Sequence, residues 1–316
     1  MRKPKTLQQA IAYFSNPDNS VAFLVERRWP NGVTCPTCAS KEVRWLPTRR
    51  LWECKSKHPR KQFSAKVGTI MEDSALPLDK WLVAMWMIAN CKNGISSYEV
   101  GRALGITQKS AWFMLHRIRL AMQNRSTVKI GGNGSEVEVD ETFIGGAARF
   151  MHQNRRIRVE RGTGDKTTVL GMLKRGGEIR AEVIPNRRRH HIEREIARHV
   201  EEDSNVYTDN LASYHELKRR NLYHKVVDHA ECYVNGRVHT NTPENFWSIL
   251  KRGLKGTYIS VEPFHLFRYL DKQMFRYNLR KLRHDALRFD HVASHLLGKR
   301  LTYAELTGKV GPATCN

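Results

Sequence analysis

The sequence predicts an α/β protein whose mixed-sheet core follows a small cysteine-containing module and a helical region. Three observations carry this prediction. From residue 136 onward, stretches with alternating polar and apolar residues alternate with stretches of helical periodicity, which is typical of α/β folds. Three of the six cysteines crowd between positions 35 and 54. Apolar residues then recur at helical spacing from residue 77 to 122.

The chain is long enough for two or three domains of ordinary size. The glycine-rich stretch IGGNGSE, 130–136, is the best candidate for a linker. We therefore expect five segments: a helical lead-in over 1–28, a cysteine module over 29–72, a helical region over 75–125, the α/β core over 130–285, and a basic C-terminal tail over 286–316.

The balance of charges predicts a polyanionic partner. Fifty-four Lys and Arg residues face 31 Asp and Glu residues, so the formal net charge is +23. Nucleic acid is the partner that this charge favours, ahead of an anionic membrane surface or a merely solvated basic surface. No apolar run approaches the roughly 18 residues of a membrane span, and no secretory signal begins the chain. We therefore expect no membrane association and a cytoplasmic, nucleoid-associated location.

The cysteine module has the spacing of a zinc site. Cys35 and Cys38 are separated by two residues, Cys54 follows after fifteen, and His58 after three more. Two close pairs joined by a short hairpin place four ligands around one tetrahedral zinc ion. A module of this size buries little core, so the metal supplies much of its folding energy. Unrelated buried thiols are the alternative.

The helical region is typical of a helix-turn-helix DNA-binding unit. A long apolar-periodic helix over 77–92 precedes two shorter ones, in which Ser96 or Ser97 and then Thr107 are candidate caps and Gly105 lies in the turn. The second helix of such a unit enters the major groove. Its polar face is expected to offer Gln108, Lys109, His116, Arg117 and Arg119; ordinary three-helix packing is the alternative.

The core carries acids at three positions. A strand from Glu136 to Gly146 contains Asp140, two strands over 167–185 and a helix over 190–202 follow, and a strand over 204–210 ends at Asp209. A late helix, 242–256, carries Glu244. This order resembles the RNase H-like fold of nucleases and DDE transposases. The resemblance implies that the first and fourth strands are neighbours and that the late helix brings the third carboxylate to the other two.

Three carboxylates with no positive partner are costly to bring together, and they make sense around divalent cations. Their hard oxygens suit two Mg²⁺ or Mn²⁺ ions, which activate the attacking oxygen and stabilise the leaving oxygen in an in-line displacement at phosphorus. Lys251 lies seven residues beyond Glu244, two turns along the same helix face, where it is expected to contact phosphate. Glu141 is expected on the opposite face of its strand, whereas Glu136 and Glu138 share the face of Asp140 and are alternative ligands.

Several phrases resemble one family. They are CPTC, QFSAKVGTIMEDSALPLDKW, GISSYEVGRALGITQKSAWFMLHRIR, VDETFIGG, YTDN and ENFWSILKRGLKGTY. They are similar to bacterial insertion-sequence DDE transposases with an N-terminal zinc ribbon and an ISXO-type catalytic domain, over about residues 30 to 280.

The resemblance implies roles for individual residues. Asp140 and Asp209 match the first two metal-binding acids of the family, Glu244 matches the third, and Lys251 matches the downstream basic residue. Family members vary at the third position, where Asn also occurs, so Asn245 is the alternative to Glu244. The second ribbon pair departs from the family pattern, because it is Cys-x3-His in place of Cys-x2-Cys.

The function implied is DNA transposition. The ribbon and helix-turn-helix would recognise the terminal repeats of the element, and the core would cut double-stranded DNA and join it to a target. A dimer or larger synaptic assembly on DNA is expected from the resemblance. The alternatives are a transcription regulator, a nuclease that cuts without joining, and an inactive transposase.

Overall fold

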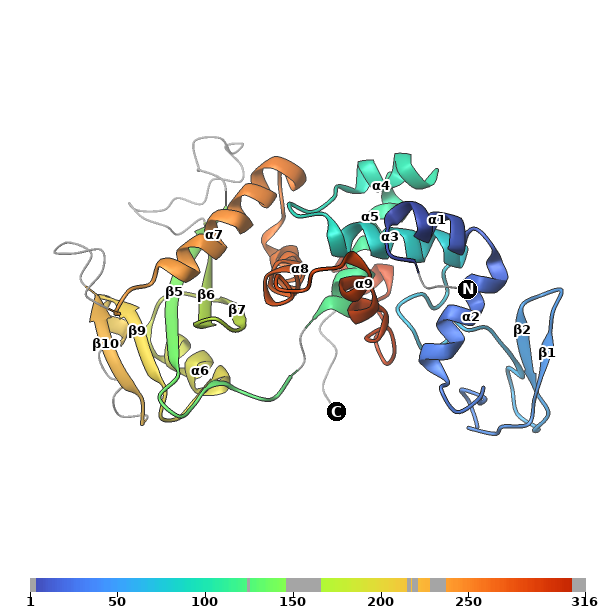
Figure 1. The fold of residues 1–316 in the computed structure, drawn as a ribbon, viewed down its shortest axis with the longest axis horizontal. Helices are drawn as coiled ribbons and strands as arrows, with labels where there is room; N and C mark the ends of the chain where they lie inside the picture. Colours follow the sequence, from blue (N-terminus) through green and yellow to red (C-terminus); the bar gives the residue numbers. More distant parts are fainter. Residues whose placement is uncertain are drawn as a thin grey trace. The chain divides into compact units, whose positions relative to one another are not determined.

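The computed structural model describes residues 4–123, 126–145, 166–214, 217, 221–227 and 237–308. The chain forms two compact units (Figure 1). Unit 1 combines residues 1–123 with 281–316, and unit 2 is residues 124–280.

Unit 1 joins helices from both ends of the chain. Its elements are α1 (Leu7–Phe14), α2 (Pro17–Arg28), β1 (Val43–Leu46), β2 (Leu51–Cys54), β3 (Gln62–Phe63), α3 (Leu78–Asn90), α4 (Ser97–Leu104), α5 (Gln108–Met122), α9 (Asp285–Ala293) and α10 (Tyr303–Leu306). The three strands form one antiparallel sheet in the order β1-β2-β3.

An aromatic cluster ties the two ends of the chain together. The ring of Phe289 in α9 lies 5.8 Å from that of Phe14, 5.3 Å from that of Phe23 and 5.0 Å from that of Trp86. The backbone N–H of Ile70 donates to the carbonyl of Leu296. Within the segment expected to be a basic tail, residues 286–308 are therefore part of the fold of unit 1.

The caps and the turn expected in the helical region are confirmed, whereas the expectation for the exposed face of its last helix is wrong in part. Ser96 and Glu99 form a reciprocal capping box at α4. Gly105 ends α4 with φ at 60°, a left-handed conformation that glycine adopts without a steric penalty. Thr107 caps α5 through the N–H of Ser110.

Three basic side chains expected on the DNA-reading face of α5 are buried. His116 is 0%, Arg117 5% and Arg119 1% exposed. The Arg117 guanidinium donates to the carbonyls of Leu301 and Glu72. Only Gln108 and Lys109 of the expected set are exposed, at the start of the helix.

Unit 2 is built on a five-stranded mixed sheet in the order β10-β9-β5-β6-β7. Strand β5 pairs antiparallel with β6 and parallel with β9, and β9 pairs parallel with β10. The bounds are β5 Glu136–Ile144, β6 Thr167–Lys174, β7 Ile179–Ile184, β9 Asn205–Asp209 and β10 Tyr223–Val227. The first and fourth strands of this sheet are neighbours, so the expected RNase H-like core is confirmed.

Helices cover both faces of the sheet (Figure 1). On one face, α6 (Arg189–His199) packs Ile192 and Ile196 against Val137, Val139 and Val206. On the other, α7 (Asn241–Gly253) and α8 (Leu266–Asn278) pack against β6 and β7. Shorter elements are the parallel pair β4 (Ile130–Gly131) and β8 (Val200–Glu201), two 3-10 turns (Ala212–Tyr214 and Pro263–His265) and a π turn (Leu254–Tyr258).

Candidate active site and zinc centre

Asp140 and Asp209 lie at the same level of two neighbouring parallel strands. The register pairs Glu136 with Asn205 and Glu138 with Tyr207, and two further residues along each strand lead to Asp140 and Asp209. Because side chains alternate along a strand, both acids share the face that α7 covers, opposite the face of Val137 and Val139. Local strand geometry therefore brings the two carboxylates together.

The electrostatics agree with this placement. Burial, followed by repulsion from the carboxylates of Glu141 and Asp209, raises the pKa of Asp140 to about 7, although a hydrogen bond from Trp247 opposes the shift. Two acids that repel one another inside a protein are stabilised by a cation. Carboxylate oxygens are the ligands that Mg²⁺ and Mn²⁺ prefer, so this donor set fits such an ion.

Trp247 orients the Asp140 carboxylate. Its indole Nε1 donates to Asp140 Oδ2 over 2.9 Å, from one turn beyond Glu244 in α7. The indole lies across Gly171, the residue of β6 that pairs with Asp140. Trp247 is 4% exposed and is part of the apolar core beneath α7, so the hydrogen bond to Asp140 is an additional role of a core side chain.

Replacing Gly171 with alanine should displace this tryptophan. A Cβ at Gly171 would lie 2.5 Å from Trp247 Cζ2 and 2.7 Å from Cη2, which is closer than atoms can pack. We expect G171A to lower the free energy of unfolding by about 1–3 kcal/mol, measured by urea denaturation. Gly256→Ala is the control, since a Cβ there meets nothing within 4 Å. Equal stability of the two variants would contradict this packing.

The remaining expected active-site residues lie on α7. Lys251 is half-buried; burial lowers its pKa, and the nearby Asp140 carboxylate opposes that shift. Glu244 and its alternative Asn245 are exposed in the first turns of the helix. Among the described residues, only the cysteine module gathers three or more potential metal ligands closely. The structure thus places Asp140 near Asp209, gives Lys251 an electrostatic interaction with Asp140, and leaves Glu244 exposed to solvent.

Glu141 lies on the opposite face of β5, as expected. It accepts a 2.5 Å hydrogen bond from the hydroxyl of Tyr214, which belongs to the apolar cluster under α6. Burial and then repulsion from Asp209 raise the pKa of Glu141, against the effect of the Tyr214 hydrogen bond. Glu141 is therefore a buried acid next to the site, facing away from α7.

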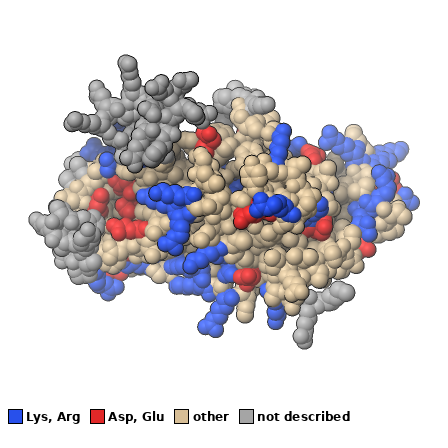
Figure 2. All heavy atoms as spheres, turned by 90° about the horizontal axis from the view of Figure 1, so that it is seen from above, with Lys and Arg blue, Asp and Glu red and all other residues tan. Residues whose placement is uncertain are grey.

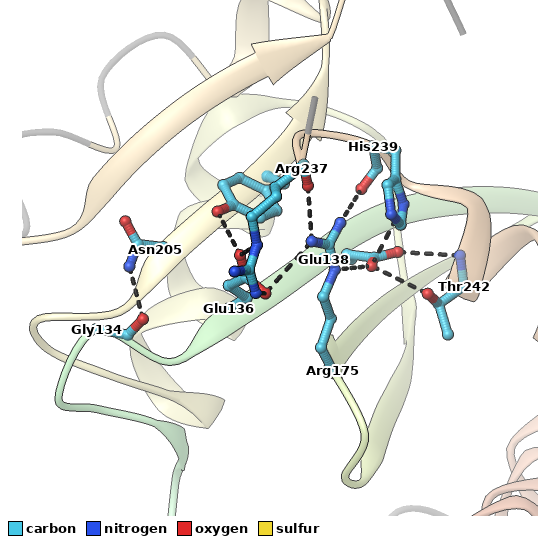
Figure 3. Close-up of polar contacts among 9 residues, drawn as sticks. Gly134, Glu136, Glu138, Arg175, Asn205, Arg237, His239 and Thr242 are labelled. Carbon is cyan, nitrogen blue, oxygen red and sulfur yellow. Dashed lines mark hydrogen bonds and ion pairs between the residues drawn. The ribbon is translucent and has the colours of Figure 1, made fainter. Parts of the chain in front are cut away.

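Glu136 and Glu138, the two alternatives to Asp140, are already engaged by protein groups (Figure 3). Glu136 pairs with Arg237 and Arg175 and accepts from the hydroxyl of Tyr207. Glu138 is 0% exposed and is bonded to Arg175 and Thr242. These contacts favour Asp140 as the acid that is available to a metal.

The raised pKa of Asp140 predicts a pH-dependent stability. Between the ordinary value of about 4 and its folded value of about 7, the folded protein holds a proton that the unfolded chain has lost. The free energy of unfolding should therefore fall as pH rises through that window and level off above it. In magnesium-free buffer, the unfolding temperature should decline more for the wild type than for Asp140→Asn between about pH 5 and about pH 7. If the unfolding temperatures of the two proteins change with pH in parallel, the pKa of Asp140 is not raised.

The four expected zinc ligands converge in unit 1. The ligand atoms of Cys35, Cys38, Cys54 and His58 all lie within 4.8 Å of one another. Cys35 Sγ is 3.4 Å from His58 Nε2, and Cys38 Sγ is 3.6 Å from Cys54 Sγ. A tetrahedral zinc ion spaces such atoms roughly 3.5–3.8 Å apart, so the arrangement fits structural zinc.

Local geometry prepares two of these ligands. His58 Nδ1 lies 2.6 Å from the carbonyl of Pro59, and donation to that oxygen leaves Nε2 with its lone pair directed at the site. Although burial acts to raise it, hydrogen bonds from Cys38, Thr37 and Cys54 lower the pKa of Cys35 to about 6. A thiolate is the form that binds zinc. The Cys-x3-His pair is therefore suited to binding zinc, although it departs from the Cys-x2-Cys pattern of the family that the sequence resembles.

No helix among the described residues has the length and apolar character needed to cross a bilayer. Comparison with known families matches residues 131–278 to the ISXO2-like transposase domain and residues 16–58 to the transposase zinc-ribbon domain. The chain is also 27% identical over 259 residues to a Halobacterium salinarum protein described as an uncharacterized protein in transposable element ISH50. That match covers 77% of this chain and 85% of the relative.

Proposed function

Because the chain belongs to the insertion-sequence transposases that join a zinc ribbon to an ISXO2-like domain, we propose that it cuts the ends of an insertion element and joins them to target DNA. Asp140, Asp209 and Glu244 are the proposed acids for two Mg²⁺ or Mn²⁺ ions. The observation that carries the proposal is the pair Asp140 and Asp209, in register on adjacent parallel strands, with a raised pKa at Asp140.

Each residue has a defined task in this proposal. Bound Mg²⁺ supplies Lewis-acid activation of the attacking and leaving oxygens at a phosphodiester. Asp140 would offer Oδ1 to the ion, since the Trp247 indole donates to Oδ2. Asp209 faces it from the adjacent strand, and Glu244 would complete the ligand set from the exposed first turn of α7. The nucleophile is water for cleavage and a DNA 3′-hydroxyl for joining.

Basic side chains beside the acids are suited to holding the DNA backbone. Lys251 lies near Asp140, and Arg252 and Lys255 are exposed on the following turn. Over the face drawn in Figure 2, Lys and Arg side chains are more widespread than Asp and Glu. Release of counterions from such contacts makes binding strongly salt-dependent.

We assign recognition of the element ends to unit 1. The ribbon and the capped helices α4 and α5 form the expected DNA-reading module, with Gln108 and Lys109 exposed at the start of α5. Two ends must be held together for joining, so the active form on DNA is proposed to be a dimer or a larger assembly.

The experiment is a strand-transfer assay. Purified protein is incubated with Mg²⁺, labelled DNA carrying the flanks of its own gene and a supercoiled target plasmid. We expect nicks at the element end and labelled DNA that is covalently joined to the target. Cleavage without joined product would favour the alternative of a nuclease. Specific binding of the flanks with neither product would favour a regulator.

A further inference from the structure

A buried acid connects the sheet to the helix that carries Glu244. Glu138 lies two residues before Asp140 on the same face of β5 and is 0% exposed. Its Oε2 accepts the backbone N–H of Thr242 over 3.0 Å, and its Oε1 accepts the Thr242 hydroxyl over 3.0 Å (Figure 3). The first turn of α7 is thereby bonded to β5 from both the backbone and the side chain of Thr242.

This acid supplies a cap that the helix does not make for itself. The first N–H groups of an α-helix have no partner within the helix, and a preceding side chain normally accepts from one of them. Thr240, the N-cap residue of α7, makes no such capping bond with its side chain. Glu138 fills the role from a neighbouring strand, and its negative charge also suits the positive end of the helix dipole.

Arg175 neutralises the buried carboxylate and fixes the chain that leads into α7. Its Nε donates to Glu138 Oε1, from the turn between β6 and β7. Its Nη1 donates to the carbonyl of Arg237 over 2.6 Å, and Nη2 donates to that of His239 over 3.2 Å (Figure 3). Glu138 therefore contacts the start of α7, and Arg175 contacts the residues just before it.

The position of Glu244 follows from two fixed points. Thr242 is bonded to Glu138, and Trp247 is bonded to Asp140, two residues further along the same face of β5. Glu244 lies between Thr242 and Trp247 on the helix, so its distance from Asp140 depends on both bonds. We propose that Glu138, with Arg175, is a positioning residue that holds α7 in the place from which Glu244 reaches the metal beside Asp140.

This inference rests on the proposed function and predicts a specific defect. We expect Glu138→Gln to weaken binding of Mn²⁺ alone to the zinc-loaded full chain by roughly 10–100-fold, as measured by electron paramagnetic resonance titration. The Mn²⁺ concentration that gives half-maximal DNA cleavage should rise by the same factor. A Gln amide keeps the size of the side chain but loses one of the two acceptors and the charge that pairs with Arg175.

Matched variants separate this role from a general loss of charge or of fold. Glu136→Gln removes a neighbouring acid that also pairs with Arg175 but is bonded to Arg237 and Tyr207 and not to α7, and it should change Mn²⁺ affinity by less than about twofold. Thr242→Val removes only the hydroxyl bond to Glu138. It should shift Mn²⁺ binding in the same direction by a smaller factor, even if the Glu138 variant does not fold.

The outcomes distinguish this inference from the function on which it rests. Asp140→Asn should abolish Mn²⁺ binding at the site; if it does not, the proposed function fails. If Asp140→Asn abolishes binding while Glu138→Gln matches Glu136→Gln, the positioning role alone is wrong. It is also wrong if Glu138→Gln weakens binding but Thr242→Val leaves it unchanged.

Discussion

Replacing Asp209 or Asp140 with alanine is expected to lower both cleavage and joining of DNA by at least about 10³-fold in Mg²⁺. Each aspartate lies two residues beyond the last paired residues of β9 and β5, and each supplies charge that the other cannot replace. Binding to element-end DNA should stay within about twofold of the wild type, because we assign that task to unit 1, whereas both aspartates belong to unit 2.

A matched control shows that the loss is local. Glu202→Ala removes an exposed acid of the same unit, seven residues before Asp209, and should retain full activity. Circular dichroism and gel-shift titration establish that each variant is folded and binds DNA. More than roughly a tenth of wild-type activity in either aspartate variant would be incompatible with the mechanism.

Cysteine-to-serine substitution at Cys54 is expected to remove zinc from unit 1. The Cys54 thiol is 1% exposed and lies 3.6 Å from that of Cys38, so a hydroxyl there leaves three thiolate or imidazole ligands in a site shaped for four. Zinc binding supplies much of the folding energy of so small a module. We therefore expect zinc content to fall from one per chain to near zero, with loss of affinity for the element end.

Metal analysis and gel-shift titration measure the two effects. Cys91→Ser is the control, since Cys91 lies at the end of α3 and outside the ligand set, and it should keep one zinc per chain. Retention of zinc by Cys54→Ser would show that these four side chains do not form the site.

The elements of the core were predictable because each one carries a local signal. The alternation around Asp140, the glycine turn after Lys174 and the apolar periodicity around Trp247 each specify one strand, turn or helix without distant information. The zinc ligands were predictable for the same reason, since their spacing alone defines two close pairs of ligands. Family resemblance then supplied the order in which the strands pair.

Long-range contacts were not predictable in this way. Arg117 lies on the polar face that the sequence predicts for α5, but the structure buries it. Its guanidinium donates to the carbonyl of Leu301, 184 positions away. The bond from Trp247 to Asp140 requires the absence of a side chain at Gly171, on a third element. A glycine inside an apolar strand indicates that another group packs closely against the backbone there, but the sequence does not show which group it is.

The capping of α7 by Glu138 was missed for a similar reason. The strand pattern placed this acid on the face of Asp140 and so made it an alternative metal ligand. Its partner Arg175 comes from another hairpin, and its helix partner Thr242 lies 104 positions away. Only the fold shows that both oxygens are already used, which leaves Asp140 as the available acid.

Anomalous diffraction from crystals of the zinc-loaded protein, grown with Mn²⁺ and element-end DNA, would locate the metal at the proposed active site. We expect Mn²⁺ peaks between the carboxylates of Asp140 and Asp209, with Glu244 turned in to complete the ligand set. Manganese bound elsewhere, or a phosphodiester positioned away from these acids, would contradict the proposed active site.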